Sequence, residues 1–470
     1  MNTKPNSPGR VKRRRRVRCA PLPGLVAGTE PLASSAGGTL LVQAARASGL
    51  DRGLRRALSP WRAATAVHHP GKVVLDLASA LALGADCLAD VAVVRAQPAV
   101  FGSVASDPTV SRTVDRLAAA GNPALAAVAD AVAAARAAAW THRCPVPTSG
   151  AVMVDLDATV VVAHSEKQSA AATFKRTFGF HPLFAFVDHD PATGAGGEVL
   201  AGLLRPGNAN ANSAADHITV LDQALEQLPG PVRARVVVRA DGGGGTKAFL
   251  TRITNLGLQY SIGIGTAIGV DQVLLARLPK AAWTQAYDPD GRPRESAQVA
   301  ELTGLLPELT GRGWPARMRV IARRERPHPG AQLRLTDVEG WRITLFATNT
   351  PTGQLADLEV RHRLRARAED RIRALKDLGL RNLPLHDTAQ NRVWLTAVML
   401  AQNLLTWTAT LALGAHRATE PKRLRLRLLN VAARVLTTGR RVTLRLPAHW
   451  PWNTELLTAH QRLTGLPAPG

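Results

Sequence analysis

The first third of the chain has the hydrophobic pattern of packed helices. From residue 40 to about 140, Ala and Leu recur at helical spacing, and Gly or Pro separates the runs. The stretch SDPTVSRTVDRLAAAG predicts a helix that Asp107 caps, with Pro108 in its first turn and Gly121 at its end. We therefore expect a helical domain at residues 21–147.

The pattern changes after Pro147, where β-branched and aromatic runs alternate with turn residues. Three such runs come first and can form a meander; helical and strand-like segments then alternate. Ser213 and Asp216 are placed for a capping box at the first of these helices. This element order is that of an α/β, ribonuclease-H-like core. The predicted strands are 151–162, 177–187, 197–204, 232–240 and 259–265, and the predicted helices are 213–228 and one from about 246.

Residues 282–352 interrupt this core with a different pattern. Pro and Gly punctuate the segment, and the alternating runs ARMRVIARRE and GWRITLFATN predict a β-rich insertion. A long helix follows from about Leu355 to Leu378. The predicted core therefore has a first part at 148–281 and a second part, with the helix, at 353–415.

One helix of this second part is apolar enough to be mistaken for a membrane span. Val393 to Ala415 has no charged residue in 23 positions. Because it contains Gln402, Asn403 and four threonines, and basic sequence flanks it, we expect a buried core helix and no membrane partner. Residues 1–20 should be a basic, disordered arm, and 416–470 a basic, helical C-terminal tail.

The charge of the chain indicates what kind of partner it binds. The chain has 470 residues, with 59 Lys and Arg against 35 Asp and Glu, a formal net charge of +24. Such an excess favours a polyanion, most often nucleic acid. The interval 361–445 alone holds 18 Lys or Arg against five Asp or Glu. Three scattered cysteines without a CxxC pair fit a reducing cytoplasm and exclude a disulfide scaffold.

Basic residues in three places are candidates for contacts to DNA. Arg112 and Arg116 lie four apart on the predicted 107–120 helix and therefore share a face. That helix is either a recognition helix or an ordinary helix with a solvated basic face. We expect the helical domain at residues 21–147 to bind DNA. The other candidates are Arg13, Arg14, Arg15 and Arg16 in the arm, and Arg440 and Arg441 in the tail.

Acidic residues inside strands are the first candidates for chemistry. Asp155 and Asp157 lie two apart in AVMVDLDATVV, so both point to one face of the sheet. Burying such a pair is costly unless a cation lies beside it, and a divalent metal is the simplest cation. The alternative is an exposed edge strand with two solvated acids.

Asp241 directly follows the buried run VVVRA. A carboxylate at the carboxyl end of a strand can meet the acids of a neighbouring strand, and carboxylate oxygens suit Mg²⁺ or Mn²⁺. Gly242 to Gly245 is not a nucleotide-binding loop, because Thr246 and Lys247 stand in the wrong order.

The helix RHRLRARAEDRIRALKDLG aligns four polar residues on one stripe. His362, Arg365, Glu369 and Lys376 fall within about 60° of one another at 100° per residue. One acid framed by cations suits a metal ligand between phosphate-binding groups. Simple pairing of Arg365 with Glu369 is the alternative.

The order of two aspartates and then a helical glutamate, after a β-rich insertion, resembles the DDE transposases of bacterial insertion sequences. His362, Arg365, Glu369 and Lys376 match the Tyr-x2-Arg-x3-Glu-x6-Lys signature of one large branch, with His in place of the usual Tyr. Other stretches look like the thirteen-eighty group of that branch and span about residues 100–445: ASDPTVSR, VDLDAT, FGFHPL, LLRPGN, VVRAD, KRLRLRLL and TGRRVTL.

The resemblance implies a metal-dependent enzyme that cuts the terminal inverted repeats of its element and joins them to target DNA. Asp157, in a D-x-T context, Asp241 and Glu369 would be the catalytic metal ligands, with Asp155 as an alternative first acid. Two Mg²⁺ or Mn²⁺ ions would bind there. His362, Arg365 and Lys376 would position phosphates.

The implied partners are double-stranded DNA, at the element ends and the target, and a second copy of the chain in a homodimer or larger synaptic complex. The resemblance also implies a bacterial cytoplasmic, nucleoid-associated location. Two other functions remain open: a non-catalytic DNA-binding protein descended from a transposase, and a ribonuclease-H-like nuclease without strand transfer.

Overall fold

We analysed the protein in a computed structural model. It describes residues 28–190, 196–265, 270, 275, 278–306, 309, 312–327, 330, 340–414 and 420–467. By their contacts, residues 32–470 form one compact unit and residues 1–31 another. The basic arm predicted at residues 1–20 lies outside the described residues.

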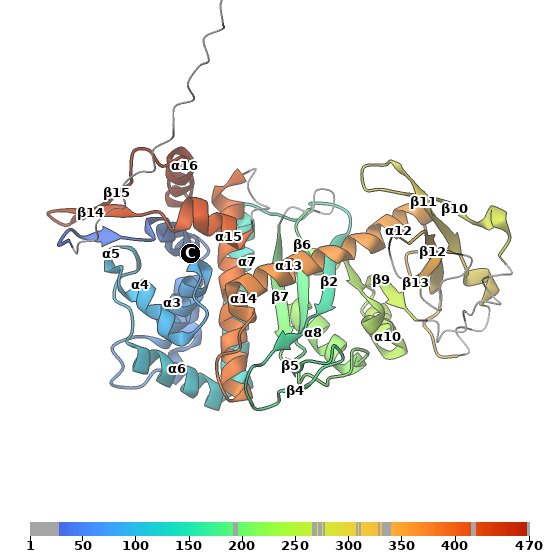
Figure 1. Ribbon diagram of the computed structural model, residues 1–470, viewed down its shortest axis with the longest axis horizontal. Helices are drawn as coiled ribbons and strands as arrows, with labels where there is room; N and C mark the ends of the chain where they lie inside the picture. The colour runs from blue at the N-terminus through green and yellow to red at the C-terminus, as the bar shows by residue number, and fades with distance from the viewer. Residues whose placement is uncertain are drawn as a thin grey trace, which may run out of the picture. The chain divides into compact units, whose positions relative to one another are not determined.

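A nine-stranded mixed sheet runs through the unit of residues 32–470, in the order β10-β11-β12-β13-β9-β8-β2-β6-β7 (Figure 1). β2, β6 and β7 form an antiparallel meander, and β8 and β9 follow parallel to β2. The predicted meander and the strands after it are therefore present, but the strand predicted from residue 232 begins only at Val236, because Gly230–Arg233 form a short helix. Their bounds are β2 Val152–Ala158, β6 Leu183–Asp188, β7 Gly197–Leu203, β8 Val236–Ala240 and β9 Gln259–Ile264.

The β-rich insertion extends this sheet. β13 pairs antiparallel with β9, with Leu345 opposite Ile264, and β12, β11 and β10 follow outward. The insertion thus shares hydrogen bonds with the core instead of standing apart from it. Its strands are β10 Thr284–Tyr287, β11 Pro293–Glu301, β12 Arg319–Glu325 and β13 Arg342–Thr348.

A small sheet lies just beyond the end of β2. It has the order β3-β5-β4, formed by Val161–Val162, Phe178–Phe180 and Ala171–Ala172. The Thr159 N–H donates to the Pro182 carbonyl at 3.1 Å, which ties the start of this sheet to the start of β6. The single strands predicted at 151–162 and 177–187 are each divided at this point.

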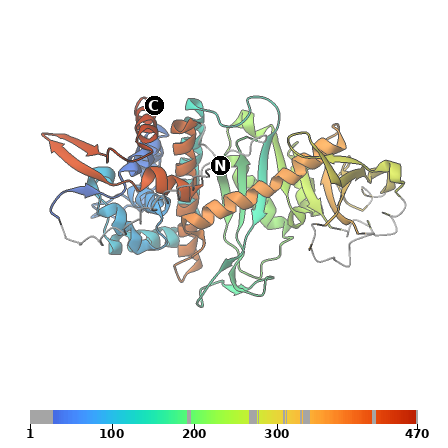
Figure 2. The same ribbon diagram turned by 45° about the horizontal axis from the view of Figure 1, so that its top comes forward.

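Helices cover the large sheet, and two consecutive helices cross it. In Figures 1 and 2, α12 and α13 run across the sheet, and α13 contacts β2. The predicted helix from Leu355 is present but has a 3-10 turn at Leu364–Ala366, and its path ends where Gly379 has a φ of +102°. The bounds are α8 Ala214–Glu226, α9 Gly230–Arg233, α10 Lys247–Asn255, α12 Leu355–Arg363 and α13 Arg367–Leu375.

The N-terminal helices share their core with the C-terminal part of the chain. α14 packs against α1, α3, α6 and α7, and α16 packs against α1 and α14. The helices are α1 Thr39–Ala47, α2 Leu50–Ala57, α3 Pro70–Leu83, α4 Val91–Arg95, α5 Pro98–Phe101, α6 Asp107–Ala120, α7 Asn122–His142, α14 Thr388–Ala412, α15 Pro421–Leu424 and α16 Asn453–Thr464.

Two helices of this bundle, α7 and α14, are long and apolar enough to cross a membrane by length and composition. In the most apolar part of α14, 83% of the residues are buried inside the protein. Trp394 and Trp407 of α14 are among the largest fully buried side chains. The apolar stretch predicted as a core helix therefore packs as one.

Two local predictions need correction. Ser106 occupies the cap position of α6, and Asp107 is its first helical residue, where it pairs with Arg95. The tail is not wholly helical: β14 Ala433–Thr438 and β15 Arg441–Arg445 form a hairpin that pairs with β1 Leu32–Ala33. The alternation of Val, Leu and Thr in this hairpin favours strands over a helix.

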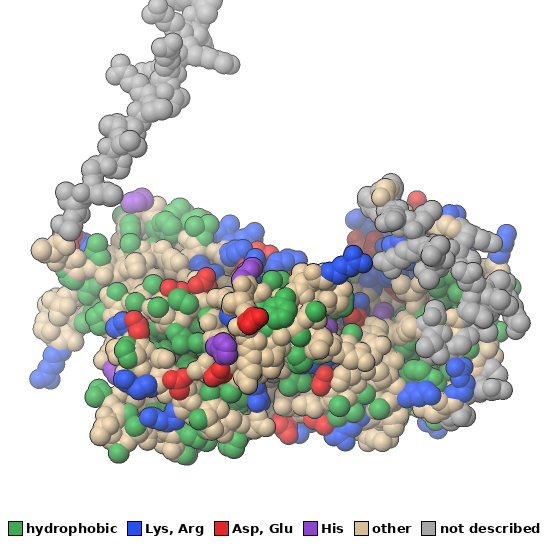
Figure 3. All heavy atoms as spheres, turned by 60° about the horizontal axis from the view of Figure 1, so that its bottom comes forward, with side chains coloured by type: hydrophobic (Ala, Val, Ile, Leu, Met, Phe, Trp, Pro, Cys, Tyr) green, Lys and Arg blue, Asp and Glu red, His purple; other side chains and the backbone are tan. Residues whose placement is uncertain are grey.

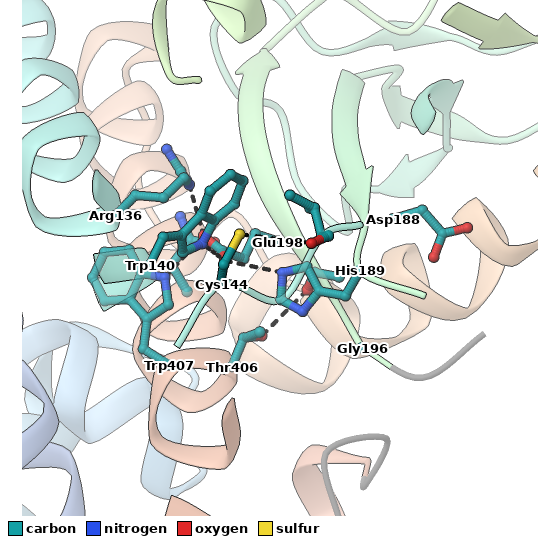
Figure 4. A network of polar contacts seen from close by, with 12 residues as sticks. Arg136, Trp140, Cys144, Asp188, His189, Gly196, Glu198, Thr406 and Trp407 are labelled. Atoms are coloured by element: carbon teal, nitrogen blue, oxygen red, sulfur yellow. Dashed lines mark hydrogen bonds and ion pairs between the residues drawn. The ribbon is translucent and has the colours of Figure 1, made fainter. Parts of the chain in front are cut away.

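A buried carboxylate joins the helices to the sheet. Glu198 of β7 is fully buried and accepts from Arg136 Nε at 2.6 Å and Trp140 Nε1 at 2.8 Å, both on α7 (Figure 4). It also accepts from Trp407 Nε1 of α14 at 2.8 Å and lies 3.0 Å from His189 Nε2. One side chain thus connects three elements that are distant in sequence.

Candidate active site

Two predicted acids meet at the carboxyl edge of the sheet. β2 and β8 are parallel, with Leu156 in register with Ala240, so Asp157, near the end of β2, lies at the same level as Asp241, which directly follows β8. Asp157 accepts from the Ala158 N–H and Asp241 from the Gly243 N–H, each at 2.9 Å. Both side chains remain partly exposed.

Glu369 is the third acid of this group. It lies exposed on α13, whose buried side includes Ala368, Arg371 and Ile372. Burial and the charge of Asp241 raise the pKa of Asp157 to about 6; the Ala158 N–H and Arg365 lower it, and Glu369 raises it further. Asp241, Glu369 and Arg365 therefore all lie within electrostatic reach of Asp157.

The three acids suit a divalent cation, because their mutual repulsion is relieved when a cation binds between them. Their ligand atoms do not all lie within 4.8 Å of one another. Among the described residues, Asp86, Cys87 and Asp90 are the one group of three potential ligands whose atoms all lie within 4.8 Å. That group has a structural explanation, because the Asp90 carboxylate accepts from the Asp86 and Cys87 N–H groups at a helix start.

Asp155 has a different role from Asp157, although both lie on β2. It is 1% exposed and forms a bidentate ion pair with Arg239 of β8, at 2.6 and 2.8 Å. Asp188 and Arg371 complete this buried network. The cation beside Asp155 is therefore arginine, which contradicts the alternative that Asp155 is the first metal ligand.

The predicted stripe of His362, Arg365, Glu369 and Lys376 divides into three environments. The ring of His362 stacks on Phe346, with centroids 4.4 Å apart, and its Nδ1 lies 3.2 Å from Ser261 Oγ. Burial and the nearby Arg365 lower the pKa of His362 to about 3, so it is neutral. This placement contradicts a role for His362 as a phosphate-binding cation.

Lys376 lies at the end of α13 in a basic neighbourhood. Burial, Lys175 and Arg381 each lower its pKa. Of the stripe, only Arg365 and Glu369 act electrostatically on Asp157. The 3-10 turn between α12 and α13 breaks the regular 100° spacing on which the predicted stripe depends.

Other polar residues beside Asp241 were not predicted as site residues. Arg205 is 3% exposed, donates to the His181 carbonyl at 2.9 Å and pairs with Asp216 at 3.1 Å. Burial and Arg205 lower the pKa of His181 and of His217, whereas Asp241 raises both. The stretch LLRPGN contains Arg205 and was the sequence signal that could have pointed to this residue.

The residues predicted to contact DNA lie on separate elements. Arg112 and Arg116 are exposed on α6, and Arg440 and Arg441 are exposed at the turn between β14 and β15 and at the start of β15. Arg13, Arg14, Arg15 and Arg16 lie outside the described residues.

Comparison with known proteins gave a family and a distant structural likeness. Residues 26–468 match the model of the family described as transposase DDE domain group 1. No curated protein gave a significant match. A cryo-EM structure of the piggyBac transposase synaptic complex with hairpin DNA is 7% identical, with a TM-score of 0.39, over 85% of this chain and 82% of that chain. At that similarity it places no residue of the site.

Proposed function

Because the chain belongs to the transposase DDE domain group 1 family, we propose that it is a DNA transposase that cuts the terminal inverted repeats of its element and joins the 3′-hydroxyl ends to target DNA. The observation that supports this proposal is the register of β2 with β8, which brings Asp157 beside Asp241, together with the pKa of Asp157, which burial and the charges of Asp241 and Glu369 raise to about 6. These are the three acids of the DDE order.

The strand order supports a ribonuclease-H-like core. An antiparallel meander of β2, β6 and β7, with β8 and β9 added parallel to β2, is the arrangement that this core requires. The Arg-x3-Glu-x6-Lys spacing from Arg365 to Lys376 favours the branch with the Tyr, Arg, Glu and Lys signature and its thirteen-eighty group. His362 departs from the Tyr of that signature and packs on Phe346.

Asp157, Asp241 and Glu369 would hold Mg²⁺ or Mn²⁺, two ions per site. Bound there, such ions activate the attacking hydroxyl and stabilise the leaving oxygen during displacement at phosphorus. Asp157 must be ionised to bind a cation, so at limiting Mg²⁺ cleavage should decline as the pH falls below about 6.

The remaining residues of the site bind and orient DNA. Arg365, beside the carboxylates, would hold the scissile phosphate, and Lys376 would hold the backbone together with Lys175 and Arg381. Arg112, Arg116, Arg440 and Arg441 are exposed and suited to phosphate contacts further along the DNA. Since two ends must be cut together, we expect a homodimer or larger complex on nucleoid DNA.

The test is cleavage by the purified protein of a DNA fragment that carries the element's own end, in Mg²⁺, with a target plasmid present. Wild type should nick at the element boundary and give strand-transfer products. Asp157→Ala, Asp241→Ala and Glu369→Ala should each reduce cleavage at least a thousandfold, while DNA binding stays within a few-fold of wild type.

Asp370→Ala is the matched control. Asp370 is also exposed on α13 but pairs with Arg373 at 2.9 Å, so its removal should leave cleavage intact. Undiminished cleavage by Glu369→Ala would remove that residue from the site. Cleavage without strand transfer would instead support a nuclease, and binding without cleavage a DNA-binding protein.

A further inference from the structure

A tight turn at Thr173–Thr177, between β4 and β5, presents three side chains to solvent. The Thr173 N–H donates to the Thr177 carbonyl at 2.7 Å, their Oγ1 atoms are 2.7 Å apart, and the Arg176 N–H donates to the Thr173 carbonyl at 3.0 Å. Arg176 has a φ of +58°, a strained value for a residue with a side chain. The turn is therefore held in one conformation.

An aromatic side chain lies at the tip of this turn. Phe174 is 69% exposed, and the exposed Lys175 places its Nζ 5.6 Å from the ring centroid. Phe178 and Val162 of the same small sheet are 42% and 40% exposed. The face of the molecule drawn in Figure 3 carries exposed hydrophobic side chains next to Lys and Arg side chains. An exposed ring flanked by cations has the composition of a platform for nucleic-acid bases.

The turn lies beside the proposed active site. Its sheet begins directly after β2, with Val161 opposite Phe180 and the Thr159 N–H bound to the Pro182 carbonyl. Asp157 is only two residues before Thr159. The ring of Phe174 lies 5.4 Å from that of His181, whose backbone N–H donates to the Arg205 carbonyl at 3.0 Å. Asp241 and Lys175 both act electrostatically on His181, so the turn and the carboxylates are near the same side chain.

The base of the hairpin is fixed to the chain that follows α13. The Gln168 N–H donates to the His386 carbonyl at 3.1 Å, and Thr388 Oγ1 lies 2.9 Å from Ser169 Oγ. Lys167 also donates to the Leu383 carbonyl. Such anchoring supports the base of the hairpin that carries the ring, as a positioning residue needs.

We propose that Phe174 stacks on an unpaired base of the strand that is cut, next to the scissile phosphate, while Lys175 and Arg176 bind the flanking phosphates. This inference rests on the proposed function. Unstacking a terminal base has a free-energy cost, and an aromatic side chain that receives the base offsets it. The stacked base would orient the phosphate over Asp157, Asp241 and Glu369. Phe174 is thus a positioning residue.

The test compares cleavage of a fully paired element end with cleavage of the same end mismatched beside the cut. Phe174→Ala should slow cleavage of the paired end about tenfold or more, the effect of removing one aromatic ring from a stacked base. On the mismatched end, where opening is already complete, the defect should shrink to a few-fold. Phe174→Trp should restore cleavage of the paired end.

Leu457→Ala is the control, because Leu457 of α16 is similarly exposed, at 52%, and should leave both rates unchanged. If wild type cleaves and Phe174→Ala cleaves both ends equally well, the stacking role is wrong and the proposed function stands. Equal defects on both ends without rescue by Trp would also overturn the stacking role, as would a defect in self-association alone. Absence of wild-type cleavage would overturn the proposed function itself.

Discussion

Asp155 and Asp157 lie on the same face of β2 yet meet opposite electrostatic environments. Asp155 faces the guanidinium of Arg239 and is 1% exposed. Asp157 faces two further carboxylates, with Arg365 and one backbone N–H opposing them. Side chains two residues apart in a strand can therefore have opposite effects. The ionised Asp155 stabilises the folded chain, whereas the ionised Asp157 is repelled by neighbouring carboxylates, and a bound cation would relieve that repulsion.

We predict that Asp157→Asn stabilises the metal-free protein. The carboxyl has a pKa of about 6 in the folded state against 3.8 normally, so its ionised form costs stability. The cost begins as the pH rises above 3.8 and is complete above about 6. Above pH 7 the variant should gain about 1–2 kcal/mol in the free energy of unfolding after solvent screening, and the gain should shrink toward pH 4.

Asp155→Asn makes the same change at the other aspartate of β2 and should have the opposite effect on stability. It removes the partner of a buried arginine and should cost about 3 kcal/mol or more. Chemical denaturation of both variants in a chelating buffer, at pH 4 and pH 7.5, measures the two effects. Destabilisation by Asp157→Asn at pH 7.5 would contradict the repulsion that we assign to these acids.

At the scale of elements, strand pairing in the β14–β15 hairpin brings arginine side chains close together. Arg434 lies directly opposite Arg445, and Thr438 opposite Arg441. Like charges opposite one another on paired strands destabilise a hairpin, unless an anion lies between them. Val435 and Leu444 form another cross-strand pair and pack against the core, so the hairpin keeps its register and its arginines stay on the outer face.

Arg440→Ala and Arg441→Ala should each weaken DNA binding in a salt-dependent manner. Removing one phosphate-binding cation lowers the slope of log K against log salt by about 0.9. Fluorescence anisotropy titrations from 50 to 200 mM salt measure this slope. Arg292→Ala is the control, because Arg292 already pairs with Asp290 at 3.3 Å. A slope unchanged by both tail variants would exclude the hairpin from the DNA interface.

At the scale of the whole molecule, Glu198 connects the sheet to helices from both ends of the chain. Burial works to raise its pKa, but Arg136, His189 and Trp140 outweigh burial and lower the pKa to about 2. Arg136 is also fully buried, and this carboxylate is its counter-charge. The helical bundle and the large sheet are thus linked by an ion pair as well as by apolar packing.

Glu198→Gln should destabilise the protein by about 3–5 kcal/mol, because it leaves Arg136 buried without a counter-charge. The effect should be full above pH 4.5 and disappear as the pH falls toward 2, the pKa of the folded state. Glu226→Gln, an exposed change on α8, should stay within about 0.5 kcal/mol. Urea denaturation compares them, and equal stabilities would contradict a linking role for Glu198.

The strands, the β-rich insertion, most helices and the position of Asp157 beside Asp241 were predictable from the sequence, because they depend on local periodicity and on the rule that parallel strands end at one edge. The helical tail was predicted wrongly, because Arg-rich composition concealed the alternation of Val, Leu and Thr in β14 and β15.

The roles of individual side chains were decided by tertiary structure. Asp155 is neutralised by Arg239 and Arg371, which come from two other elements and which it shares with Asp188. His362 is neutral because burial against the sheet, where its ring stacks on Phe346, and the nearby Arg365 lower its pKa. Sequence spacing gives the face on which a side chain lies. It does not give what covers that face, because the environment of a buried charged group depends on residues distant in sequence that only folding brings together.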